Sequence, residues 1–228
     1  MPRHSTRYEG SEGESSWVAL LLGILALLAF AGGGWWLYKR TQENRLKPIA
    51  YAVAFDVSQS MNEAERRRCI GVMNELIDSI FAESVRVKIW RYAENLREVA
   101  DKYPQRSEEL NSIYRDGVLK AMGSWGTRPD LPLTEMLQFV QDPQNQNRQI
   151  VLCLFTDGEN HAPEQTRKIA EQLAQQDKLS AILVGPVKEQ YRMTMRRSLE
   201  PLEKAQKLIL FSPSDTGDAV RQLKSRLH

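Results

Sequence analysis

The stretch that decides the fold begins at residue 49 and reads IAYAVAFDVSQSM, seven apolar residues followed by Asp56 and a serine-rich turn. An apolar run with no polar face is typical of a strand that is buried on both sides of a sheet. A second run of this kind, residues 150–155, also leads into an aspartate, Asp157. The two runs therefore predict two strands of a parallel sheet that is covered on both faces.

Shorter strands and amphipathic helices alternate around these two runs. Helical patterns occur at residues 63–81, 108–122, 131–140, 163–177, 190–200 and 215–227, and shorter strand patterns occur at residues 85–89, 96–99, 179–184 and 208–211. Alternation of strands with helices favours a parallel sheet with helices on both faces. We predict one α/β domain over residues 49–228, with a doubly wound, mainly parallel sheet.

The N-terminal part of the chain has a different composition. Residues 17–38 contain no charged side chain, and as a helix they would extend about 33 Å, enough to cross a hydrocarbon core about 30 Å thick. Aromatic residues stand at both ends of the segment, as expected at the two headgroup levels of a bilayer. We predict a polar tail (residues 1–16), a transmembrane helix in the lipid bilayer (17–38) and a basic linker (39–48).

The charges that flank the predicted span give its orientation. Lys and Arg are in excess on the C-terminal side, where Lys39 and Arg40 end the span. The positive-inside rule therefore predicts a single-pass membrane protein with a cytoplasmic C-terminal domain. A cleaved signal peptide is the alternative, because residues 29–31 resemble a cleavage site, but the acidic tail and the long apolar stretch favour a retained anchor. Ala29 and Gly33 form a small-xxx-small pair, which leaves oligomerisation open.

Polar side chains follow both buried strands at the point where each strand ends. Asp56, Ser58 and Ser60 alternate along the first turn, and Asp157 lies in the second. In parallel sheets, ligands bind in the crevice outside the carboxyl ends of the strands. Carboxylates and hydroxyls suit a hard cation, so we predict a site for Mg²⁺ or Mn²⁺, between which these donors do not choose.

Three motifs resemble the metal-ion-dependent adhesion site of von Willebrand factor type A domains, in the same order: Asp56-x-Ser58-x-Ser60-Met61, Gly126-Thr127 and Thr156-Asp157-Gly158-Glu159. The resemblance covers about residues 47–228 and implies the Rossmann-like fold of that family. It also implies the metal ligands: hydroxyls of Ser58, Ser60 and Thr127, with Asp56 and Asp157 bound directly or through water. Trp125 stands where a second glycine is common, which leaves the shape of that loop open.

Catalysis has little support in the sequence. A phosphatase-like nucleophile at Asp56 would need a second carboxylate two residues on, where Ser58 stands. His161 has no triad partner and is expected at the rim of the site. We therefore expect a protein that is not an enzyme.

Charge and cysteine usage exclude further classes. The chain has 31 Lys and Arg against 29 Asp and Glu, which argues against nucleic-acid binding. The run Arg66-Arg67-Arg68 is expected to face solvent, with contact to an anionic lipid or phosphate as the alternative. Cys69 and Cys153 lie in apolar patterns and are expected in the core.

The leading hypothesis for function is a membrane-anchored interaction module whose metal captures an Asp or Glu carboxylate of a partner protein. A metal held by few anionic ligands is electron-poor, so it attracts an outside carboxylate. The alternative is a structural or regulatory subunit of a membrane-associated complex, in which the metal mainly stabilises the fold. The resemblance makes an AAA+ ATPase a candidate member of such a complex.

Overall fold

The computed structural model describes residues 48–79, 85–120, 123–124 and 126–227. The predicted tail and transmembrane helix, and all of the predicted linker except Pro48, lie outside these ranges. Among the described residues, no helix combines the length and apolar character needed to cross a membrane. The fold described below is that of the unit Lys47–His228.

Six strands of the described residues form one sheet in the order β3-β2-β1-β4-β5-β6. Neighbouring strands run parallel, except that β3 pairs with β2 in the antiparallel sense. The strands are β1 (Ile49–Asp56), β2 (Arg86–Tyr92), β3 (Leu96–Lys102), β4 (Gln149–Phe155), β5 (Leu179–Gly185) and β6 (Leu208–Leu210). The order moves outward from β1 in both directions, so the predicted doubly wound, mainly parallel sheet is confirmed.

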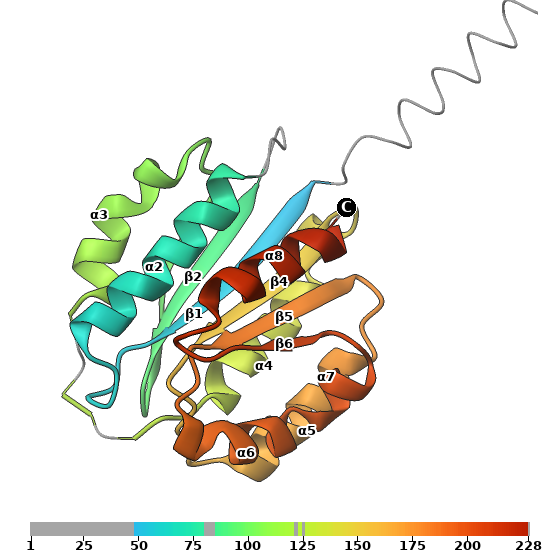
Figure 1. Cartoon of the computed structure of the whole chain (residues 1–228). Helices are drawn as coiled ribbons and strands as arrows, with labels where there is room; N and C mark the ends of the chain where they lie inside the picture. The colour runs from blue at the N-terminus through green and yellow to red at the C-terminus, as the bar shows by residue number, and fades with distance from the viewer. Residues whose placement is uncertain (1–47, 80–84, 121–122, 125, 228) are drawn as a thin grey trace, which may run out of the picture. The chain divides into compact units, whose positions relative to one another are not determined.

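Helices cover both faces of this sheet (Figure 1). They are α2 (Glu63–Asp78), α3 (Asn111–Ile113), α4 (Asp130–Gln141), α5 (Pro163–Ala174), α6 (Glu189–Ser198), α7 (Glu200–Lys204) and α8 (Thr216–Leu227). Buried residues of α2 and α8 belong to one apolar cluster, and Ile113 of α3 packs against it. Buried residues of α4, α5, α6 and α7 belong to a second cluster on the other face. The domain therefore has three layers.

Strand β1 contributes to both apolar clusters. Tyr51, Val53 and Phe55 lie in the cluster that contains residues of α2 and α8, and the alanines between them lie in the other. Successive side chains of a strand point to opposite faces, so a strand between two layers has no solvent-facing side. All eight residues of β1 are buried, as its apolar sequence predicts.

The chain between β3 and α4 departs from the helix predicted over residues 108–122. It forms a 3-10 turn at Ser107–Leu110, the short α3, and a π-helical turn, η2, at Tyr114–Val118. Gly117 lies so close to β3 that an added Cβ atom would stand 2.5 Å from Val99 Cγ1. Its carbonyl accepts a hydrogen bond of 3.2 Å from Arg91 Nη1. Contacts with the sheet thus replace the regular helix that the sequence suggests.

Helix α2 has a defined cap and corrects one expectation. Asn62 caps the helix, because its side chain accepts a hydrogen bond from Glu65 N while Glu65 accepts one from Asn62 N. Arg66 is buried and donates to the carbonyls of Met61 and Leu119, so the expectation that the whole arginine run faces solvent is wrong for this residue. Buried charged groups need hydrogen-bond partners of this kind.

The remaining expectations for side chains of α2 and β4 are confirmed. Arg67 and Arg68 are exposed. The thiols of Cys69 and Cys153 are free and buried in the core. Burial raises the pKa of both thiols well above the ordinary range, so neither is reactive at neutral pH.

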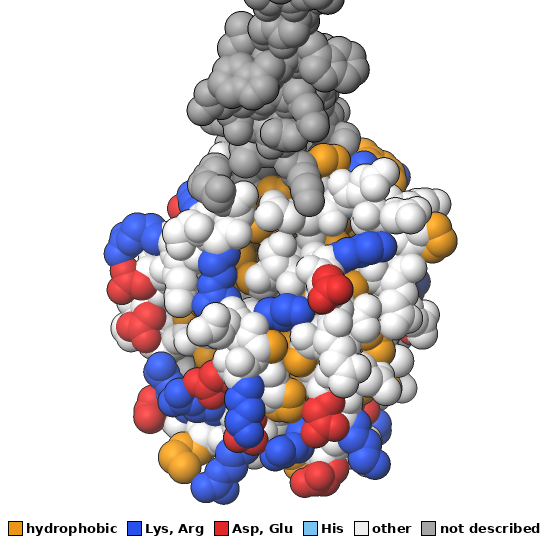
Figure 2. Space-filling model, turned by 90° about the vertical axis from the view of Figure 1, so that its right-hand side faces the viewer, with side chains coloured by type: hydrophobic (Ala, Val, Ile, Leu, Met, Phe, Trp, Pro, Cys, Tyr) orange, Lys and Arg blue, Asp and Glu red, His pale blue; other side chains and the backbone are white. Residues whose placement is uncertain are grey.

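Charged side chains of both signs are interspersed on the face shown in Figure 2, with apolar side chains scattered among them. Among the described residues, the large hydrophobic side chains that are exposed are Tyr103 and Met193. Large exposed apolar patches are what marks many interaction surfaces. The described surface offers mainly polar and charged groups.

Candidate metal centre

The carboxyl ends of β1 and β4 bring two aspartates to the same edge of the sheet. The two strands are parallel neighbours, with Phe55 opposite Phe155. Asp56 is the last residue of β1, and Asp157 follows β4 by two residues. Their relative exposures are 0% and 1%. Asp and Glu are almost never buried this fully without a partner group, so each needs a compensating contact.

Hydrogen bonds fix Asp56 and the two serines that follow it. Ser58 N donates to Asp56 Oδ1 over 2.9 Å, and the hydroxyl of Thr156 donates to Asp56 Oδ2 over 3.0 Å. The hydroxyl oxygens of Ser58 and Ser60 lie 2.9 Å apart. Ser58 is buried and Ser60 is half-buried. The structure therefore brings the first three predicted ligands together in one turn.

Thr127 reaches the same region from the loop before α4. Gln59 N of the serine turn donates to Ser124 O over 3.1 Å, which ties the two loops together. His161 N donates to Thr127 O over 3.0 Å, and Thr127 N donates to His161 Nδ1 over 3.3 Å. Thr127 is fully buried. Three loops that are distant in sequence thus meet around the predicted ligands.

Glu159 links Thr127 to Asp157. The Thr127 hydroxyl donates to Glu159 Oε2 over 3.4 Å, and Glu159 N donates to Asp157 Oδ1 over 3.1 Å. Glu159 Oε1 lies 3.2 Å from His161 Nε2. The His161 side chain is half exposed, in agreement with its predicted position at the rim. The sequence identifies Glu159 only as part of the Thr-Asp-Gly-Glu motif. In the structure, its side chain contacts Thr127 and its backbone amide contacts the Asp157 carboxylate.

Lys188 is the site residue that the sequence does not reveal. It follows β5, and its ammonium nitrogen lies 2.9 Å from Asp157 Oδ2 and 2.8 Å from Ser60 O. Glu65 Oε1 is 3.6 Å away. Burial acts to lower the pKa of Lys188, but its contacts with Asp157 and Glu65 together outweigh this effect, so the pKa is raised and the side chain is charged. Lys188 is therefore the cationic partner that compensates Asp157.

Asp56 has no such cation. Among the described residues it forms no ion pair, and its partners are the Ser58 amide and the Thr156 hydroxyl. Burial raises the pKa of Asp56 to about 6; hydrogen bonds from Ser58 and Thr156 oppose this shift, and the nearby charge of Asp157 adds to it. A buried carboxylate that is destabilised in its charged form is suited to a bound cation.

The donors fit a hard divalent cation. Two carboxylates and three hydroxyls lie on loops that hydrogen bonds tie together, and all are oxygen ligands of the kind that Mg²⁺ and Mn²⁺ accept. No group of three or more His, Cys, Asp or Glu side chains in the described part of the chain has the arrangement of a metal site. A cation here would therefore depend on neutral hydroxyls as much as on carboxylates, as the sequence predicts.

Comparison with known proteins identifies the domain type. A family model described as "von Willebrand factor type A domain" matches residues 52–222. Metal binding at the adhesion site is frequent in such domains. No curated protein compared with the chain matches it.

Several solved structures share the fold at low sequence identity. An aerotolerance-related membrane protein from Bacteroides fragilis has a TM-score of 0.59 and 10% identity, with 79% of this chain and 98% of that chain covered. BatB from Bacteroides thetaiotaomicron, described as a conserved hypothetical protein, has a TM-score of 0.55 and 12% identity, with 78% and 98% covered. Proximal thread matrix protein 1 from the mussel byssus, with a zinc-occupied MIDAS motif, has a TM-score of 0.57 and 13% identity, with 79% and 48% covered.

Proposed function

This chain belongs to the von Willebrand factor type A domain family, and from that premise we propose a metal-dependent mode of protein capture. Domains of this family are typical protein-interaction modules. In the proposal, a divalent cation is held by Asp56, Ser58, Ser60, Thr127 and Asp157 and takes an Asp or Glu carboxylate of a partner protein as a further ligand. The proposed cation is Mg²⁺ or Mn²⁺.

The observation that carries this proposal is Asp56. Its carboxylate is fully buried, it forms no ion pair with the described residues, and its hydrogen-bond partners are the neutral Ser58 amide and Thr156 hydroxyl. A bound divalent cation would supply the missing positive charge. Because three of the five proposed ligands are neutral hydroxyls, the two carboxylates would do no more than balance the charge of the cation, which would stay electron-poor enough to take an outside carboxylate as a further ligand. The mussel protein with the zinc-occupied MIDAS motif shares the fold of this chain, and this likeness of fold supports the proposal of a metal site.

The residues around the cation would have distinct roles. Asp56 and Asp157 would supply its negative charge, and the hydrogen bonds from Ser58 N and Glu159 N to these carboxylates would hold their orientation. Glu159 and His161 stand at the rim and would contact the partner. We assign no catalytic step to the site, so phosphoester turnover that disappears in Asp56→Asn would overturn this part of the proposal.

We also propose that residues 17–38 anchor the domain in a membrane and that the domain faces the cytoplasm. These residues lie outside the described part of the chain, and the basis is the apolar length and the flanking charge. The description of the Bacteroides fragilis structure as a membrane protein agrees with an anchor in that protein. Topology reporters fused after the C-terminal residue test the orientation. Reporter activity that requires an extracytoplasmic location would refute it.

Capture of a partner is tested on the full chain from membranes. Proteins that co-purify in Mg²⁺ and are lost in EDTA are the expected partners, and Ser58→Ala should lose the same proteins. Ser225→Ala, which removes a hydroxyl from the exposed surface of α8, is the matched control and should retain them. Retention of the partners by both Ser58→Ala and Asp56→Ala in Mg²⁺ would refute capture through the metal.

A second candidate function is favoured by Lys188. Its ammonium compensates Asp157 and also contacts Ser60 O, so part of the site is held together by the chain itself. In this candidate the chain is a structural or regulatory subunit of a membrane-associated complex, with an AAA+ ATPase as one possible member, and the metal mainly stabilises the fold. Complexes that survive EDTA and Asp56→Ala, while the free energy of unfolding still rises with Mg²⁺, would favour it over metal-dependent capture.

A further inference from the structure

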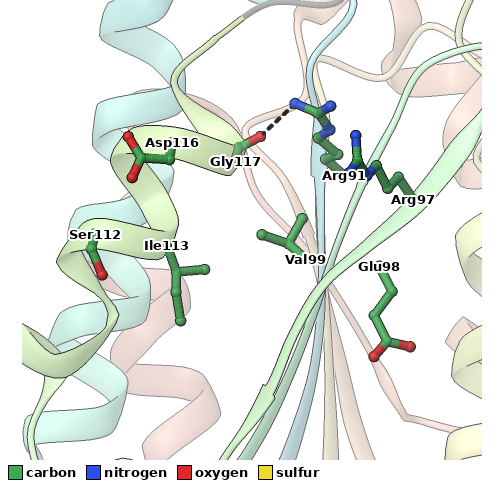
Figure 3. Close-up of a pocket in the computed structure, with 8 residues that line it drawn as sticks. All are labelled: Arg91, Arg97, Glu98, Val99, Ser112, Ile113, Asp116 and Gly117. Atoms are coloured by element: carbon green, nitrogen blue, oxygen red, sulfur yellow. Dashed lines mark hydrogen bonds between the residues drawn. The ribbon is translucent and has the colours of Figure 1, made fainter.

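A pocket of about 370 Å³ lies between strand β3 and the segment α3–η2 (Figure 3). Arg91 and Arg97 form one end of it, and Val99 and Ile113 lie along its apolar part. We refer to it as the Arg91–Arg97 pocket. No residue of the proposed metal site lines it.

The two arginines face each other with the same charge. Arg91 of β2 and Arg97 of β3 are directly opposite partners in the antiparallel ladder. Like charges placed opposite each other across two strands destabilise the pair. Within the described part of the chain, neither guanidinium forms an ion pair. In this part of the chain, two positive charges therefore lie opposite each other without an ion-pair partner.

The acidic residues near the pocket are engaged elsewhere. Glu98 Oε2 lies 3.1 Å from Lys88 Nζ, and Asp116 Oδ1 lies 3.4 Å from Arg115 Nε. In Figure 3 both carboxylates point away from the two guanidinium groups. The two guanidinium groups therefore have no carboxylate partner among the acidic residues that line the pocket.

Arg91 is held in place by the chain around it. Its Nη1 donates to Gly117 O over 3.2 Å, while its Nε is buried and makes no hydrogen bond with the described residues. A buried donor without a partner costs free energy, and this donor belongs to a side chain that lines the pocket. Gly117 itself is fixed by its close contact with Val99. One arginine is therefore preorganised, and the exposed Arg97 stands opposite to complete a binding site.

We propose that the Arg91–Arg97 pocket binds a phosphate monoester. Such a group carries a charge of about −1.5 to −2 at neutral pH, which matches two guanidinium groups. The guanidinium fork also suits the geometry of phosphate oxygens. Val99 and Ile113 offer an apolar wall to the organic part of the ligand. The site is independent of the proposed metal, and it gives the domain a second recognition surface.

Two sources can present this chemistry: a small organic phosphate, or a phosphorylated side chain of a partner. Phenyl phosphate and a short phosphoserine peptide are the probes that separate them. Tighter binding of phenyl phosphate indicates the free molecule, and tighter binding of the peptide indicates a phosphorylated partner. Either result supports the site, whereas binding of neither probe overturns it.

The test is isothermal titration calorimetry of the purified full chain with both probes in EDTA. The salt concentration is moderate, because high salt would screen the attraction between the exposed guanidinium group and the phosphate. Arg97→Gln should weaken binding roughly tenfold, as expected for the loss of a charge-assisted contact. Arg68→Gln, an exposed arginine of α2, is the matched control and should bind within about twofold of wild type, since it removes the same charge elsewhere. Equal binding by wild type and Arg97→Gln would overturn the proposal.

A charge reversal separates loss of the site from loss of the fold. Arg97→Glu places an opposite charge across from Arg91, so the thermal midpoint should rise while phosphate binding disappears. Phenylacetate is the probe for the type of anion. If it binds as tightly as phenyl phosphate, or if Arg97→Glu still binds phosphate, the assignment of a phosphate site is wrong.

Discussion

Replacement of Lys188 by methionine gives the sharpest test of the metal centre. Lys188 Nζ lies 2.9 Å from Asp157 Oδ2. At an effective dielectric constant of about 20, the attraction of two unit charges at this distance is about 6 kcal/mol. The Lys188 side chain is 33% exposed, so solvent screening and desolvation reduce the net contribution, and we take about 2 kcal/mol as its order of magnitude. Methionine keeps the length of the side chain and removes the charge.

Two measurements follow from this value. In EDTA, Lys188→Met should unfold at lower urea concentration, with a free energy of unfolding reduced by about 2 kcal/mol, because Asp157 loses its cationic partner. At saturating Mg²⁺ the difference in stability between the two proteins should vanish, because tighter metal binding offsets the loss of the ammonium. A cation that binds Asp157 competes with the ammonium, so removing the ammonium should tighten Mg²⁺ binding by up to about thirtyfold, the factor equivalent to 2 kcal/mol. Isothermal titration measures this affinity directly.

The matched control is Lys178→Met. Lys178 is exposed and precedes β5, whereas Lys188 follows the same strand at the opposite end. This variant should leave both the Mg²⁺ affinity and the stability in EDTA unchanged. The reasoning is refuted if Lys188→Met binds Mg²⁺ no more tightly than wild type while its stability in EDTA falls. Absence of Mg²⁺ and Mn²⁺ binding in every variant would instead refute the metal site itself.

Three further predictions concern a buried carboxyl, a glycine and a helix cap. The pKa of Asp56 is about 6 in the folded, metal-free protein and near 4 in the unfolded chain, so protonation of this carboxyl favours the folded state. This contribution to the free energy of unfolding is complete below pH 4, and about 3 kcal/mol is lost as the pH rises through 6. Urea unfolding in EDTA should show this loss in wild type relative to Asp56→Asn, and a difference that does not change with pH would contradict it. Gly158→Ala should lower the thermal midpoint of unfolding, because the φ of Gly158 is +96° and the new Cβ would stand 2.6 Å from Val187 Cγ1. Gly71→Ala, on α2 with open space around the new Cβ, should raise the midpoint, and equal shifts in the two variants would refute the predicted strain at Gly158. Asn62→Ala should cost about 1 kcal/mol in urea unfolding, and an unchanged midpoint would show that the cap contributes nothing.

The sequence predicts the central strands of the sheet because their composition is compatible with few other environments. Residues 49–55 and 150–155 are apolar throughout, and only a strand between two layers can bury every side chain of such a run. Asp56 and Asp157 then follow at strand ends, where parallel sheets place their ligands. The contacts among Asp56, Ser58 and Ser60 are local in sequence, and these are the contacts that a motif can reveal.

Contacts between distant loops are harder to predict. Lys188 is in no motif, and its approach to Asp157 depends on how the loop after β5 returns across the end of β4. Its backbone amide also donates to Asp157 O over 2.7 Å, a pairing that only the folded chain defines. The sequence does not predict the π-helical turn η2 for a similar reason. Its apolar residues have helical spacing, but the turn depends on the close approach of Gly117 to Val99 of β3.

The sheet ends at β3 on one side and at β6 on the other, and neither edge favours addition of another strand. Strand β3 has the exposed charged residues Arg97, Glu98 and Lys102 and an irregular register against β2, while β6 has three residues. Charges, bulges and short edge strands prevent backbone pairing between molecules. Recognition by this domain should therefore depend on side chains and loops, so that a partner is selected by its chemical groups and not by its tendency to extend a sheet.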